Sequence, residues 1–114
     1  MTVAQSRRAS DVRVIGLISL AHGSSHFFHL ILPPMFPWLK EAFALSYAEL
    51  GLLMSVFFVV SCVVQATSGF LVDRIGARPV LFAGVGLLTL AALTYSQSNG
   101  YPMLVLGAVI AGCG

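Results

Sequence analysis

Three histidines and a serine in the first apolar segment have the types and spacing for chemistry. His22, His26 and His29 lie at positions i, i+4 and i+7, which places them on one face of a helix, with Ser25 beside them. Imidazole titrates near neutral pH and can bind or pass protons. Because polar groups facing lipid are costly, we expect this face to line a substrate or proton cavity. The alternative is that these histidines only hydrogen-bond neighbouring helices.

A second polar cluster joins two apolar runs between residues 69 and 78, where the sequence reads Gly-Phe-Leu-Val-Asp-Arg-Ile-Gly-Ala-Arg. Gly69 allows another helix to approach closely. Asp73 can pair with Arg74 or Arg78, or place its carboxylate at the N-terminus of another helix. Gly76 supplies the turn. The pattern predicts a tight polar turn at a membrane surface; the alternative is an ordinary short loop.

Other kinds of chemistry find no support in the sequence. Cys62 and Cys113 both fall in apolar runs without charged neighbours, so we interpret them as packing residues. The sequence has no Ser-His-Asp or Cys-His set with a carboxylate nearby, and we therefore predict no enzyme. A metal site at the histidines would need ligands from other segments, so we predict neither a metal nor a cofactor.

The composition indicates a membrane protein. Of 114 residues, 58% are hydrophobic and only 9% are charged, which is too few charges to cover the surface of a soluble domain. The net charge of +2 does not favour a nucleic-acid partner. The lipid bilayer is the expected partner.

Four apolar runs follow a short polar start. We predict a cytoplasmic tail over residues 1–12 and membrane helices over residues 13–114. The fold class is an all-α membrane protein with three complete transmembrane helices and a truncated fourth, because the last run is too short to cross a hydrocarbon core. The expected spans are 14–38, 47–72, 79–96 and 101–114.

The basic residues predict the orientation. Five of them lie at the N-terminus or between the second and third spans, and only one lies between the first and second; they are Arg7, Arg8, Arg13, Arg74 and Arg78 against Lys40. We therefore expect a protein of the cell (inner) membrane. Its N-terminus and the loop at 73–78 are expected on the cytoplasmic side. A cleaved signal peptide is disfavoured because the apolar run is long and lacks a cleavage site.

At residues 69–78 the chain resembles the major facilitator superfamily. The cytoplasmic signature of that family between its second and third helices runs Gly-x-Leu-x-Asp-Arg-x-Gly-x-Arg, and Gly69 to Arg78 match every fixed position. The resemblance extends to the topology of the whole chain. It implies a twelve-helix secondary transporter that works by alternating access, in which this stretch forms a cytoplasmic gate motif with Asp73 contacting the second half.

Three further stretches resemble the fosmidomycin-resistance-type branch of the superfamily. They are Ser19-Leu-Ala-His22, Phe36-Pro37-Trp-Leu and Ser46-Tyr-Ala-Glu49-Leu-Gly51. The chain departs from that branch at Ser25-His26, where an Asn-Asp pair is common. It also has Ala108 where many drug/proton antiporters of the superfamily carry an arginine, a feature that it shares with the branch.

The resemblance implies that the chain is the first part of a transporter for a small solute or drug, and is not competent alone. We expect it to be a fragment whose partners include the missing C-terminal helices and a small-molecule substrate. Two alternatives remain. One is a small four-helix multidrug transporter that acts as a dimer, which would need an acidic residue in its first span. The other is a non-transporting membrane subunit.

Overall fold

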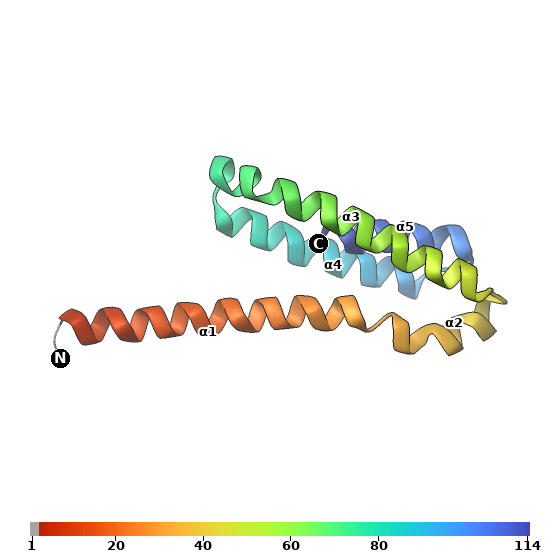
Figure 1. Cartoon of the computed structure of the whole chain (residues 1–114), viewed down its shortest axis with the longest axis horizontal. Coiled ribbons are helices and arrows are strands. Elements are labelled where there is room, and N and C mark those ends of the chain that lie inside the picture. Colours follow the sequence, from red (N-terminus) through yellow and green to blue (C-terminus); the bar gives the residue numbers. More distant parts are fainter. Residues whose placement is uncertain (1–2) are drawn as a thin grey trace. The chain divides into compact units, whose positions relative to one another are not determined.

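The computed structural model describes the backbone of residues 3–114 and the side chains from residue 10 onward. Over residues 3–114 the chain is helical and contains no β-strand, which confirms the all-α prediction. The chain divides into two compact units, Met1–Met35 and Phe36–Gly114. The elements in order are α1 (Val3–Leu30), the short 3-10 helix η1 (Pro33–Met35), α2 (Phe36–Phe43), α3 (Tyr47–Ile75), α4 (Ala77–Ser96) and α5 (Tyr101–Cys113) (Figure 1).

Helix α1 begins well before the first apolar run. The expected tail over residues 1–12 is helical from Val3 on. No proline or glycine occurs between Val3 and Ile15, and alanine, glutamine and arginine are good helix formers. Extending an existing helix adds one hydrogen bond for each residue that is fixed, so the helix continues into the polar segment. The cytoplasmic location of this segment remains a prediction.

The first expected span, 14–38, is divided by prolines. Helix α1 ends at Leu30, and Pro33 and Pro34 follow within η1. A proline lacks the N–H that a continuing helix needs, and it disfavours helical backbone in the residue before it. The Met35 N–H instead donates to the Leu32 carbonyl at 3.0 Å, and α2 starts at the next residue.

Helix α2 ends and α3 begins in a short, well-defined turn. Ala44 adopts a positive φ of 52°, and the Leu45 N–H donates to the Lys40 carbonyl at 3.0 Å, which closes the end of α2. Ser46 then caps α3. Its backbone N–H donates to Glu49 Oε2 at 2.8 Å, and the Glu49 N–H donates to Ser46 Oγ at 3.2 Å, so the two residues form a capping box.

The core of Phe36–Gly114 forms where α5 packs against both α3 and α4 (Figure 1). Glycines make this packing close. A methyl group added at Gly112 would lie 2.8 Å from the Phe57 carbonyl oxygen of α3, and one added at Gly107 would lie 2.6 Å from Cε1 of Tyr95 in α4. The Tyr101 hydroxyl donates to the Glu49 carbonyl at 3.1 Å. The buried core residues are Leu45, Leu50, Leu53, Phe57, Leu104 and Ala108.

Outside this core the helices expose apolar side chains. Phe70 of α3 and Phe82 of α4 are 74% and 75% exposed. Three helical stretches are long and apolar enough to cross a membrane, Ser10–Phe43, Tyr47–Ile75 and Ala77–Ser96, and the apolar helix Tyr101–Cys113 is shorter. This matches the predicted three complete spans and one short one. The exposed side chains suit contact with lipid or with further helices.

Polar groups inside these spans are satisfied locally. The hydroxyls of Ser55, Thr67 and Thr89 donate to carbonyls three or four residues earlier in their own helices. The buried Ser61 hydroxyl accepts from Gln65 Nε2 at 2.9 Å. A hydrocarbon environment requires such pairing, because it contains no water that could hydrogen-bond these polar side chains.

The close contact at Gly112 yields a stability prediction. Gly112→Ala should lower the free energy of unfolding by about 1–3 kcal/mol, because the new methyl group meets a backbone oxygen that cannot turn aside. The measurement is denaturant unfolding of the purified chain in detergent. Gly86→Ala in α4 is the matched control, since nothing lies within 4 Å of the position of its added methyl. Equal effects of the two substitutions would contradict this packing.

Candidate functional site

The histidines of α1 form one close pair and one separate ring. The Nε2 atoms of His22 and His26 lie 3.1 Å apart, and their ring centroids lie 4.5 Å apart with ring planes at 86°. His29 lies one turn further on, with its centroid 6.0 Å from that of His26. Helical spacing placed all three on one face, and in the structure His22 and His26 share a hydrogen bond.

Ser25 accompanies His29 and not the pair. Its Oγ lies 3.5 Å from His29 Nε2, at the outer limit for a hydrogen bond. In the pair, one Nε2 must carry a proton while the other accepts it, because two bare nitrogen lone pairs at this distance would repel. The face therefore combines a proton-sharing pair with a second polar position one turn away.

The predicted turn at residues 73–78 consists of a single residue between two helices. Gly76 separates α3 from α4 with φ of 89°, a conformation that favours glycine. Its N–H donates to the Val72 carbonyl at 2.8 Å and so completes the end of α3. Asp73 and Arg74 lie in the last turn of α3, and Arg78 lies in the first turn of α4.

The charges of this turn are not paired with each other. Within the described residues, Asp73 forms no ion pair with Arg74 or Arg78, so the local pairing considered from the sequence does not form. Asp73 lies at the negative end of the α3 dipole and Arg78 at the positive end of the α4 dipole. Each position costs about 0.3–1 kcal/mol. Only Arg74 is placed favourably, so local helix stability does not explain Asp73 and Arg78.

Gly69 lies on an open part of α3. Nothing in the structure lies within 4 Å of a methyl group built at this position. The close helix approach that Gly69 would allow is therefore not made by the described residues. Gly69 is thereby unlike Gly112, whose missing side chain is needed for contact with α3.

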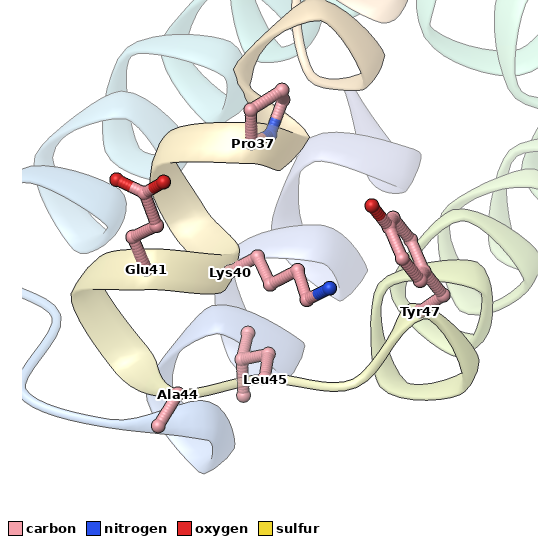
Figure 2. Close-up of a pocket in the computed structure, with 6 residues that line it drawn as sticks. All are labelled: Pro37, Lys40, Glu41, Ala44, Leu45 and Tyr47. Atoms are coloured by element: carbon pink, nitrogen blue, oxygen red, sulfur yellow. The ribbon is translucent and has the colours of Figure 1, made fainter.

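A pocket of about 430 Å³ lies where α2 meets the start of α3 (Figure 2). Lys40 reaches toward Tyr47, with Nζ 3.9 Å from the ring centroid, a cation–π contact. Glu41 points in another direction from the same helix (Figure 2). The other lining residues are Pro37, Ala44 and Leu45.

Sequence reasoning missed this pocket. It used Lys40 only to orient the chain, and Tyr47 only as part of the stretch Ser46–Gly51 that resembles a branch of the superfamily. The available signal was the pair Pro33-Pro34, which forces a new helix to begin before Lys40, and Ser46, which is a strong helix cap. Together these predict a helix reversal that brings Lys40 near Tyr47.

Long apolar helices joined by short polar turns define a multi-pass membrane protein. Residues 18–114 match the family described as Major Facilitator Superfamily. The chain belongs to this superfamily, which confirms that part of the resemblance seen in residues 69–78.

Curated relatives are distant and longer. The chain is 27% identical over 89 residues to the bacillibactin exporter of Bacillus subtilis, covering 74% of this chain and 22% of that protein. It is 27% identical over 111 residues to the arabinose-proton symporter of the same organism, covering 94% and 24%. It is 25% identical over 83 residues to the quinolone resistance protein NorA of Staphylococcus aureus, covering 73% and 21%. The chain thus spans about a quarter of their length. No solved structure matches it significantly.

Proposed function

We propose that this chain is the N-terminal segment of a secondary transporter that moves a small solute or drug across the cell membrane by alternating access. The observation that carries the proposal is the family match over residues 18–114 together with the signature at Gly69–Arg78. The relatives are about four times as long, so the segment supplies only part of a transport path. The segment alone is not competent for transport.

The turn at Gly76 is the gate motif of this proposal. Asp73 and Arg78 occupy helix ends that disfavour their charges, and Gly69 beside them faces open space. A helix from the other half of the transporter would satisfy all three features. Its N-terminus would face the Asp73 carboxylate, and its backbone would approach at Gly69. This contact would hold the cytoplasmic side closed in one state of the cycle.

The histidine face of α1 is the cavity lining of this proposal. His22, Ser25, His26 and His29 carry polar groups in a candidate span that has no other charged or imidazole side chain between Arg13 and Lys40. Such groups belong at a watery path or a protein interior. The substrate or a coupling proton would meet the imidazoles there.

The orientation and the branch belong to the same proposal. The basic residues favour an N-terminus and a Gly76 turn on the cytoplasmic side. The fosmidomycin-resistance-type branch rests on the stretches around His22, Pro37 and Glu49. The relatives named above are an exporter, a proton symporter and a resistance protein, so the proposal names the mechanism and not one cargo.

The gate proposal is tested by neutralising Asp73 in the longer transporter that contains this segment. Asp73→Asn should lower the transport rate about tenfold or more, because the gate loses its charged contact, while membrane abundance stays unchanged. The measurement is substrate uptake or efflux in vesicles, with abundance read by immunoblot. Asp11→Asn removes the same charge outside the motif and should transport normally. Normal transport kinetics of Asp73→Asn would contradict the gate role and would mean that the turn only sets the orientation through its basic residues.

The cavity proposal is tested by removing one imidazole. His22→Ala in the longer transporter should reduce transport without reducing membrane abundance, because the lost group contacts cargo or proton and not the fold. The same vesicle assay measures it, and Ser24→Ala is the control, since the Ser24 hydroxyl only donates to the Leu20 carbonyl of its own helix. Unchanged transport by His22→Ala would exclude the cavity role.

A further inference from the structure

The spacing of the His22 and His26 nitrogens suits a metal ion. Their Nε2 atoms lie 3.1 Å apart on successive turns of α1. Two imidazole nitrogens that bind the same Zn²⁺ at about 2.0–2.1 Å lie about 2.9–3.4 Å apart, from octahedral to tetrahedral angles. The observed separation falls inside this range.

We propose that His22 and His26 form a binding site for a divalent first-row cation such as Zn²⁺, with both Nε2 atoms as ligands. Two histidines at i and i+4 on one helix are a known geometry for zinc, because a single helical segment then presents both rings to one ion. Imidazole is also the side chain that Zn²⁺, Cu²⁺ and Ni²⁺ share as a preferred ligand. The proposal concerns binding and does not depend on the transport function.

Metal binding requires a change of tautomer in one ring. Without an ion, one Nε2 carries the proton of the hydrogen bond and the other accepts it. For both to bind the ion, the donor ring must carry its proton on Nδ1, so that each Nε2 directs a lone pair at the metal. The proton moves from Nε2 to Nδ1 of the same ring, so this change of tautomer releases no proton.

The pair supplies two ligands and leaves the other positions to water. Among the side chains that the structure describes, no group of three or more histidines, cysteines or acids converges on one point. A structural zinc site has four protein ligands, so this site is expected to bind an exchangeable ion. His29 is outside the pair, because its ring centroid is 6.0 Å from that of His26 and its Nε2 lies near Ser25.

The test uses the 114-residue chain, purified in detergent without a histidine tag and titrated with Zn²⁺ by calorimetry. One site should be found. His22→Ala and His26→Ala should each weaken the affinity by about tenfold or more, which is about 1.4 kcal/mol. His29→Ala, the matched control on the same helix, should leave it unchanged. Circular dichroism should show equal helix content in all variants.

A further variant separates metal binding from hydrogen bonding. His26→Asn keeps a polar side chain that can hydrogen-bond His22, but it removes the imidazole ligand, so it should bind Zn²⁺ as weakly as His26→Ala. No Zn²⁺ binding by the unchanged chain would overturn the proposal. So would unchanged affinity in His22→Ala, which would place the ion elsewhere, or equal loss in His29→Ala. These outcomes are read on the purified chain and are independent of the transport assays.

Discussion

Gly76 alone separates α3 from α4, and its φ of 89° and ψ of 159° lie in a backbone region that is open essentially to glycine and costs other residues about 1–3 kcal/mol. The arrangement of Phe36–Gly114 depends on this reversal. It brings α3 and α4 side by side, and α5 then packs against both (Figure 1). Gly112 lets α5 come close to α3, and Gly107 lets it come close to Tyr95 of α4. Leu104 and Ala108 of α5 are buried in the core that results. One short joint therefore decides which surfaces of these helices meet and which stay free.

The same joint sets the electrostatics of the candidate gate. Because the turn consists of one residue, Asp73 and Arg78 lie within the helices themselves. Neither charge can move into a loop, away from the helix dipole that disfavours it. Asp73 remains at the end of α3 and Arg78 at the start of α4, against both helix dipoles. Charges that cost local stability are commonly kept for a contact made elsewhere. A facilitator half that presents a helix N-terminus to Asp73 would supply that contact.

The sequence predicted the features that depend on local composition. The apolar runs and the reversal at Gly76 follow directly from residue types. Features that depend on cooperativity or on side-chain conformation were not predicted. Helix α1 extends to Val3 because a helix, once formed, propagates through residues that favour it. Periodicity placed three histidines on one face, but rotamers decide that His22 meets His26 while His29 meets Ser25. Predicting the Lys40–Tyr47 contact would have required knowing that the chain turns at Ala44, between α2 and α3.

The central claim is that the reversal at Gly76 faces the cytoplasm of a facilitator-type transporter. Single cysteines near the two ends of α4 test this most directly. They are introduced into a parent protein whose Cys62 and Cys113 are replaced by alanine. Ala77→Cys lies at the first residue of α4, next to Gly76, and Asn99→Cys lies in the turn between α4 and α5; both positions are exposed. A membrane-impermeant maleimide should label Asn99→Cys in intact spheroplasts and Ala77→Cys only after lysis. Labelling of Ala77→Cys from outside, with Asn99→Cys protected until lysis, would contradict the account.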